Sequence, residues 1–318
     1  MMAGMVHPSL VTLDEIRAAR ARLEGVAVRT PLVRLPRAGL PGEIFIKNEG
    51  LQATGSFKLR GAYNKIAQLP VEERGRGVIT YSSGNHAQGV AYAARALGVK
   101  AVVVMPGNAS EKKRRATEAL GGEIVPVGPA SAERKQKAEE LAAEFGYAVV
   151  PPYDDAAIIA GQGTCGLEIV EEMPDVDLVL APVSGGGLLS GVAAAVKYLK
   201  PEACVIGVEP ELAGDARESF QTGRLVTWPA EKTTRTICDG LRTQSLGQLN
   251  FEHIRRFVDD IVTVSEDEIR EAMGVLASAG VTAEPSGAVT AAAVLFHGAE
   301  LGSYGKAVAV MSGSNYSP

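Results

Sequence analysis

A single lysine stands at the predicted start of a helix in the stretch Thr54-Gly55-Ser56-Phe57-Lys58-Leu59-Arg60-Gly61-Ala62. Ser56 is a residue type that caps helices, and the residues after Lys58 are mostly compatible with a helix. The positive end of the helix dipole disfavours another positive charge, so we expect the pKa of Lys58 to be lowered. A lysine of this kind can act as a nucleophile, although an exposed surface lysine after a cap gives the same pattern.

The composition is that of an ordinary globular protein with one large or two ordinary domains. The chain has 318 residues, 46% of them hydrophobic and 22% charged, and its net charge is −5. A negative net charge argues against a general polyanion-binding role. The basic run 112–115 is better explained as the solvated face of a helix.

Three cysteines have no paired spacing, which fits a reducing compartment: Cys165, Cys204 and Cys238. The N-terminal residues carry no signal pattern, and no apolar run is long enough to cross a bilayer. We therefore expect a cytoplasmic protein.

Short apolar runs alternate with helical patterns along most of the chain. Strands are expected at 44–46, 77–81, 101–105, 124–127, 148–150, 178–183, 205–209, 261–264 and 307–311. Helices are expected after a capping box at Thr12 and at 84–97, 110–120, 130–145, 187–199, 265–279 and 286–298, with one more around 167–170. Residues 223–258 are expected to be irregular. This alternation predicts an α/β protein with mostly parallel sheets flanked by helices.

A glycine loop, Ser184-Gly185-Gly186-Gly187, lies between a buried-strand pattern and a helix. Consecutive glycines allow backbone N–H groups to close on an anion, and the helix dipole adds attraction, so a phosphate site is expected. A tight strand-to-helix turn without a ligand is the alternative.

A dinucleotide site is the rival interpretation of this loop. Gly185 and Gly187 open a helix after a strand, and Glu209 closes the next strand, where a ribose-binding acid would stand. However, Ser190 occupies the third glycine position, and this interpretation leaves the Lys58 stretch unexplained.

The ordered motifs resemble the pyridoxal-phosphate enzymes related to threonine dehydratase and serine racemase. Besides the Lys58 stretch, they are Ser82-Ser83-Gly84-Asn85-His86-Ala87-Gln88-Gly89, Ala160-Gly161-Gln162-Gly163-Thr164, Ser184-Gly185-Gly186-Gly187-Leu188, Asp239-Gly240, Glu284-Pro285-Ser286-Gly287 and Ser312-Gly313-Ser314-Asn315. The resemblance implies the two-lobed fold of type II, in which 1–52 and 152–318 form a discontinuous large domain and 53–151 a small one. It also implies a homodimer, with no nucleic-acid or membrane partner.

By this resemblance, Lys58 binds pyridoxal 5′-phosphate covalently, Phe57 packs beside its ring and Asn85 bonds the phenolic oxygen. The loop Ser184, Gly185, Gly186, Gly187 and Leu188 would hold the phosphate, with Gly240 and Glu284 completing the cofactor site. Without the resemblance, Phe57 would be a core residue and Asn85 a helix cap.

Ser312 resembles the residue that faces the pyridine nitrogen, although it could simply begin a turn. A neutral hydroxyl leaves that nitrogen largely unprotonated, which favours prompt loss of a β-substituent. Ser314 stands where the family often has glycine, so we expect the local turn to differ from the family's.

The substrate carboxylate would be received by Ser82, Ser83, Gly84, Asn85, His86 and Gln88 at a helix N-terminus. His86 is interpreted as a structural support and not as a general base. Lys58 would remove the Cα proton. In the racemase branch, the serine that matches Ser83 can return a proton on the opposite face.

The resemblance therefore implies a dehydratase that converts L-threonine or L-serine to 2-oxobutanoate or pyruvate and ammonia. Serine racemase, alone or combined with elimination, and 3-hydroxyaspartate dehydratase are the alternatives. Only six residues follow Ser312, so we expect no C-terminal regulatory domain.

A divalent cation, Mg²⁺ or Ca²⁺, is expected beside the phosphate loop. Glu209 ends a strand and Asp215 follows in a short turn, and two carboxylates on one loop suit a hard cation. Their spacing with Ala213 resembles the metal site of serine racemases. A solvated acidic turn that caps the next helix is the alternative.

Overall fold

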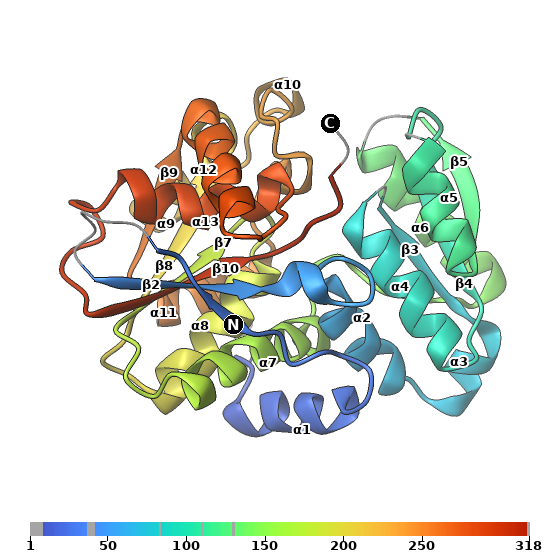
Figure 1. Cartoon of the computed structure of the whole chain (residues 1–318). Coiled ribbons are helices and arrows are strands. Elements are labelled where there is room, and N and C mark those ends of the chain that lie inside the picture. The colour runs from blue at the N-terminus through green and yellow to red at the C-terminus, as the bar shows by residue number, and fades with distance from the viewer. Residues whose placement is uncertain (1–8, 37–41, 83, 110, 129–130, 317–318) are drawn as a thin grey trace, which may run out of the picture.

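The computed structural model describes residues 9–36, 42–82, 84–109, 111–128 and 131–316. Two sheets carry the fold, and Figure 1 shows the smaller one with its helices beside the larger assembly. Within the described ranges, no helix is long and apolar enough to span a membrane.

The larger sheet has six strands in the order β1-β2-β10-β7-β8-β9. Only β1 is antiparallel to its neighbour, and the other pairs are parallel. The strands are β1 Leu32–Arg34, β2 Glu43–Asn48, β7 Leu178–Pro182, β8 Cys204–Pro210, β9 Asp260–Val264 and β10 Lys306–Met311. Because β10 lies between β2 and β7, the first strands and the last strand of the chain are neighbours (Figure 1).

The smaller sheet is fully parallel, with the strand order β5-β4-β3-β6. Its strands are β3 Val78–Tyr81, β4 Ala101–Pro106, β5 Gly122–Val127 and β6 Ala148–Val149. The helices that alternate with them are α2 Lys58–Ala67, α3 Val71–Arg76, α4 Asn85–Ala96, α5 Glu111–Ala119 and α6 Ser131–Phe145.

The remaining helices accompany the larger sheet. They are α1 Leu13–Leu23, α7 Ala156–Glu172, α8 Gly187–Leu199, α9 Asp215–Thr222, α10 Ala230–Thr233, α11 Gln248–Phe257, α12 Glu266–Ser278 and α13 Pro285–Phe296. Three short 3-10 helices complete the described elements: η1 Glu49–Leu51, η2 Glu211–Ala213 and η3 Asp239–Leu241.

The larger sheet is buried on both faces, which explains its continuous apolar strands. Along β7, Val179 and Ala181 join a cluster with α1, α7, α8 and α11, whereas Leu178 and Leu180 join a cluster with α12 and α13. Successive side chains of a strand point to opposite faces, so one apolar run supplies two cores.

The helices α2 and α7 touch at two glycines. A Cβ atom added to Gly161 would lie 2.6 Å from the Cα atom of Gly61, a distance that real Cβ atoms do not reach. The Gly61 backbone N–H also donates to the Gln162 side-chain oxygen at 3.2 Å. This contact places the start of α2 directly against α7.

The predicted fold class and the alternation of elements are confirmed. Ser56 as the helix cap is wrong: α2 begins at Lys58 after Phe57, and Ser56 instead forms a bridge with Gly313. The irregular segment 223–258 is also wrong in part, because it contains α10 and α11. Two polar residues on the buried face of α11, Asn250 and His253, hid its apolar periodicity.

We expect Gly161→Ala to destabilise the protein by about 1–3 kcal/mol, because its methyl group would push α7 away from α2. Gly274→Ala in α12 is the matched control, since a Cβ atom there meets nothing within 4 Å. The control should gain about 0.5–1 kcal/mol from the loss of backbone freedom in the unfolded chain. Urea unfolding of both variants measures the difference, and equal free energies of unfolding would contradict the close contact.

Candidate active site

Lys58 is the first residue of α2, as the sequence predicts. Its side chain is partly buried, and its Nζ donates to the Pro152 carbonyl oxygen at 2.7 Å. Burial lowers the pKa of Lys58 from 10.5 to about 8. The direction matches the sequence-based expectation, and burial is its cause. About a tenth of this amine is therefore neutral and nucleophilic at pH 7.

Phe57 joins Lys58 to the end of the larger sheet. Its backbone N–H donates to the Ser312 carbonyl oxygen at 3.1 Å, and the Lys58 Nζ lies 5.1 Å from the centre of its ring. Ser312 follows β10 directly and is buried. The lysine and the serine predicted to face the cofactor thus belong to adjoining backbone segments.

The glycine loop connects β7 to α8, as predicted. Gly186 has a φ of 98°, a left-handed conformation that favours glycine, and it precedes α8 without a side-chain cap. Tyr153 packs on the loop so closely that a Cβ atom on Gly185 would lie 2.4 Å from its ring. Tyr153 follows Pro152, whose carbonyl oxygen accepts the hydrogen bond from the Lys58 amine. The dipeptide Pro152-Tyr153 therefore contacts both the lysine and the glycine loop.

The ends of the loop are held by polar contacts. The Ser184 hydroxyl lies 2.6 Å from the Thr243 hydroxyl, and the Gly247 N–H donates to the Gly185 carbonyl oxygen at 3.0 Å. At the other end, Leu188 is buried in the core. The N–H groups that open α8 are therefore carried on a fixed frame, which suits an anion.

Asn85 and Glu284 link the two sheets across the site. The Asn85 Nδ2 donates to the Glu284 Oε1 at 2.6 Å, and the Asn85 Oδ1 accepts from the Asn315 Nδ2 at 2.8 Å. Burial, and then the nearby Asp239 charge, raise the pKa of Glu284 to about 7. Asn85 does not cap its own helix, since Gly84 precedes α4 and Asn85 is its first residue.

His86 is buried, and its Nε2 lies 3.0 Å from the Val150 carbonyl oxygen. Burial, and then the charge of Lys58, lower the pKa of His86 to about 3. The imidazole is therefore neutral at physiological pH, in agreement with a supporting role.

The other predicted substrate residues surround the start of α4. The Ser82 hydroxyl accepts from the Gly84 N–H at 3.3 Å, and the Gln88 N–H donates to the Gly84 carbonyl oxygen at 3.4 Å within the first turn. Ser83 lies outside the described residues.

Gly240 and Ser312 both contact Ser286 at the start of α13. The Gly240 N–H donates to the Ser286 hydroxyl at 2.9 Å, and the Ser312 hydroxyl donates to the Ser286 carbonyl oxygen at 3.4 Å. The structure therefore gathers these two predicted residues around one turn. The Ser314 hydroxyl bonds the Gly50 carbonyl oxygen at 3.1 Å, so it supports the adjoining turn.

The predicted metal residues lie at the end of β8 and the start of α9. Glu209 accepts from the Ala216 and Arg217 N–H groups at 3.3 and 2.7 Å, and Asp215 is buried with its Oδ2 unpartnered among the described residues. Burial, and then Asp215, raise the pKa of Glu209, and burial raises that of Asp215 to about 7. Ala213 ends η2 nearby. The described residues contain no group of three or more His, Cys, Asp or Glu side chains suited to a metal.

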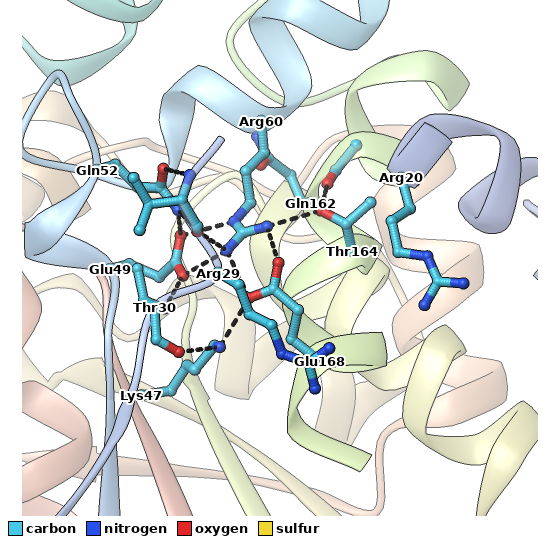
Figure 2. A network of polar contacts seen from close by, with 12 residues as sticks. Arg20, Arg29, Thr30, Lys47, Glu49, Gln52, Arg60, Gln162, Thr164 and Glu168 are labelled. Carbon is cyan, nitrogen blue, oxygen red and sulfur yellow. Dashed lines mark hydrogen bonds and ion pairs between the residues drawn. The ribbon is translucent and has the colours of Figure 1, made fainter. Parts of the chain in front are cut away.

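Sequence reasoning missed two parts of the site. Tyr153 under the glycine loop had no motif to mark it. The second part is a buried charge network around Arg60, with Lys47, Glu49 and Glu168 (Figure 2). Its signal was present in the charged residues that follow the apolar run 44–46 of β2.

The parallel α/β sheets, the partly buried Lys58 amine at the start of α2 and the glycine loop before α8 are features of the fold type II pyridoxal-phosphate enzymes. The model of the family described as pyridoxal-phosphate dependent enzyme matches residues 23–313, and the chain belongs to this family.

Similar proteins agree with this membership. The chain is 44% identical to the L-threonine ammonia-lyase of Thermotoga maritima over 312 residues, covering 96% of this chain and 76% of that protein. It is 42% identical to the catabolic L-threonine dehydratase of Escherichia coli K12 over 314 residues, covering 96% of this chain and 93% of that protein. The structure of maize serine racemase matches with a TM-score of 0.93 and 36% identity, covering 97% of this chain and 95% of that one.

The dinucleotide interpretation of the glycine loop is overturned by this membership. The matched residues 23–313 include the Lys58 stretch, which the dinucleotide interpretation leaves unexplained.

Covalent capture of pyridoxal phosphate should accelerate as the pH rises, with a midpoint near 8, because only the neutral Lys58 amine attacks the aldehyde. The rate of absorbance change after mixing with the cofactor-free protein, measured from about pH 6 to 10, gives this midpoint. A midpoint near 10.5, the ordinary lysine value, would show that burial does not tune this amine.

Proposed function

We propose that the protein is a pyridoxal-phosphate-dependent ammonia-lyase that converts L-threonine and L-serine to 2-oxobutanoate and pyruvate by β-elimination, with release of ammonia. The observation that carries the proposal is the Lys58 amine, whose pKa is lowered to about 8 at the junction of the two sheets. The threonine ammonia-lyase and dehydratase relatives, at 44% and 42% identity over 96% of the chain, support this choice of reaction.

The residues fit the cofactor. Lys58 would hold it covalently, with Phe57 beside its ring and Asn85 near its phenolic oxygen. The loop Ser184–Leu188 would bind the phosphate, since it offers the uncapped start of α8 and a left-handed glycine. Gly240, Glu284 and Ser312 would complete the site. Pyridoxal phosphate, when bound, supplies the electron sink that weakens the bonds to the Cα atom of the amino acid.

Ser312 supports elimination as the outcome. Its hydroxyl donates to a carbonyl oxygen and carries no charge, so the ring nitrogen would face a neutral partner. A neutral partner makes the ring a weaker electron sink and favours prompt loss of the β-hydroxyl. Lys58 Nζ would accept the Cα proton of the substrate, and a pKa near 8 suits this proton exchange.

The substrate carboxylate would bind at the start of α4, among Ser82, Ser83, Gly84, Asn85, His86 and Gln88. The helix N-terminus provides N–H groups and a favourable dipole for an anion. Because His86 is neutral, with a pKa of about 3, it would support this turn without exchanging protons.

Serine racemisation, alone or beside elimination, is the second candidate. It is favoured by the match to maize serine racemase, with a TM-score of 0.93. In that case Ser83 would be the group that exchanges a proton on the face opposite Lys58. 3-Hydroxyaspartate is the alternative substrate for elimination, and it differs from serine and threonine only in the group on its β-carbon.

A substrate panel on the purified enzyme loaded with pyridoxal phosphate tests the proposal. L-threonine and L-serine should yield oxoacid and ammonia, and Lys58→Ala should lose the bound colour and at least about 1000-fold in turnover, since the base and the covalent anchor are the same group. Chiral analysis of the residual amino acid reports any racemisation. If L-serine yields D-serine but no oxoacid, the enzyme is a racemase and not a lyase. Activity retained in Lys58→Ala would overturn the proposed role of the lysine.

The arrangement of the chain is proposed on the same grounds. Residues 1–52 with 152–318 would form the large domain and 53–151 the small one, which is supported by the separate sheets. A homodimer would be the working assembly. A cytoplasmic location is supported by the free thiols of Cys165, Cys204 and Cys238.

We also propose that Glu209, Asp215 and the Ala213 carbonyl bind a divalent cation, Mg²⁺ or Ca²⁺. The unpartnered Asp215 Oδ2 and the raised pKa values of both carboxyls support it, because a buried carboxylate without a cation is costly. The role would be structural, holding the turn after β8 near the phosphate loop.

Removal of divalent cations with a chelator should lower the melting temperature by a few degrees, and Mg²⁺ or Ca²⁺ should restore it. The restoration should weaken as the pH falls below about 7, since Asp215 must lose its proton to bind the cation. Asp215→Asn is the control and should not respond to added cation. If the native protein melts at the same temperature with chelator and with cation, the cation site is contradicted and the segment is only an acidic turn.

A further inference from the structure

Four buried charges gather beside the first turn of α2 (Figure 2). They belong to Lys47, Glu49, Arg60 and Glu168, whose side chains are at most 9% exposed. Two cations face two anions, so the network carries no net charge. Taking such groups out of water is expensive unless every one is paired, and here each is.

Arg60 is the centre of the network. It is held by Glu49 through Nε and Nη2 at 2.7 and 2.8 Å, and by Glu168 through Nη1 and Nη2 at 2.6 and 2.9 Å. Thr164 and the Val28 carbonyl accept further bonds at 3.1 and 3.2 Å. Only the planar fork of arginine can serve two carboxylates in this way.

The partners of Arg60 come from separate parts of the chain. Glu49 opens η1 after β2, and Glu168 lies on α7. Lys47 of β2 joins them, because its Nζ lies 2.7 Å from the Glu168 Oε2. The Thr30 hydroxyl in turn donates to the Glu49 Oε1 at 2.6 Å. The network therefore fixes the first turn of α2 to β2 and to α7.

Arg60 lies two residues after Lys58, in the same turn of α2. Two residues on an α-helix are about 200° apart, so the two side chains point in nearly opposite directions. Arg60 cannot touch a cofactor bound by Lys58. It can only set the position and rotation of the turn that carries the lysine.

Burial alone would raise the pKa of Glu49, but Arg60 and then Lys47 lower it below its ordinary value. The pKa of Arg60 is raised by Glu49 and Glu168 although burial opposes this. Both directions favour the ionised forms of Glu49 and Arg60 in their forked contact. The lowered pKa of Lys58 has burial as its cause, so Arg60 acts on the geometry of the lysine and not on its charge.

We infer that Arg60, held by Glu49 and Glu168, is a positioning residue that aims the Lys58 amine at the carbon atom it attacks. This inference rests on the proposed function, since it assumes that Lys58 captures pyridoxal phosphate. Capture joins the Lys58 nitrogen to the aldehyde carbon with loss of one water, and it needs no oxidant or reductant. A misplacement of about 1 Å can slow such a step about 100-fold.

Arg60→Lys tests the inference, because it keeps the charge and removes the fork. The matched control is Arg20→Lys, since Arg20 also pairs with a carboxylate of α7, that of Glu171, but its side chain is 48% exposed. Each cofactor-free protein is first checked for folding by circular dichroism. Two quantities are then measured: the rate of covalent capture and the affinity for pyridoxine 5′-phosphate, an alcohol that cannot bond to Lys58.

We expect Arg60→Lys to capture pyridoxal phosphate about 10- to 100-fold more slowly and to bind pyridoxine 5′-phosphate within about twofold of the native affinity. Arg20→Lys should match the native protein in both the rate of capture and the affinity for pyridoxine 5′-phosphate. Borohydride reduction and peptide mapping confirm that Lys58 is the captured residue. Capture at the native rate would overturn the inference, and so would a parallel loss of capture and alcohol binding, which a general loosening of the site would produce.

Thr164→Val carries the same test if Arg60→Lys does not fold. It removes one acceptor of the Arg60 Nη1 and keeps the shape of the side chain. Capture should slow about threefold with unchanged alcohol binding, and a native rate would contradict the positioning role.

The same measurements separate this inference from the proposed function. A native protein that captures the cofactor but eliminates nothing from threonine or serine would overturn the proposed reaction, while slow capture in Arg60→Lys would still support positioning. A native protein that captures no cofactor would overturn both.

Discussion

The guanidinium group of Arg60 joins α2 to η1 and to α7 through one side chain. Its two carboxylate partners, Glu49 and Glu168, lie 11 and 108 residues away in sequence. Breaking one partner of a buried ion pair is strongly destabilising, because it leaves an uncompensated charge in the core. The place of α2 between the two sheets, and with it the place of Lys58, depends on this arrangement.

The fold class could be predicted from the sequence because α/β proteins repeat one local pattern. Each strand of the central series is an apolar run closed by polar or glycine residues, and the helix 187–199 has the predicted bounds. The failures have local causes. Ser56 has the composition of a cap, yet its backbone is engaged by Gly313 from the far end of the chain. In α11, His253 lies buried where a periodic pattern expects an apolar side chain.

The candidate site divides in the same way. Local patterns indicate Lys58 and the glycine loop, since each stands at a helix start, whereas Asn85 is indicated by the family resemblance. The pairing of Asn85 with Glu284 spans 199 residues, and no spacing rule predicts it. Likewise, Tyr153 contacts Gly185 only because α7 and α8 pack side by side. Long-range side-chain contacts are decided by tertiary packing, which a single sequence does not display.

The position of β10 has a consequence for how the protein is made. β10 follows every other described strand in the chain, yet it pairs on one edge with β2 and on the other with β7. On the ribosome, the smaller sheet can form as soon as residue 149 has emerged, whereas the larger sheet stays in two pieces until β10 arrives. Until then β2 and β7 expose unpaired edges, which are templates for pairing between chains. The arrival of β10 therefore covers both edges at once and removes these templates for pairing.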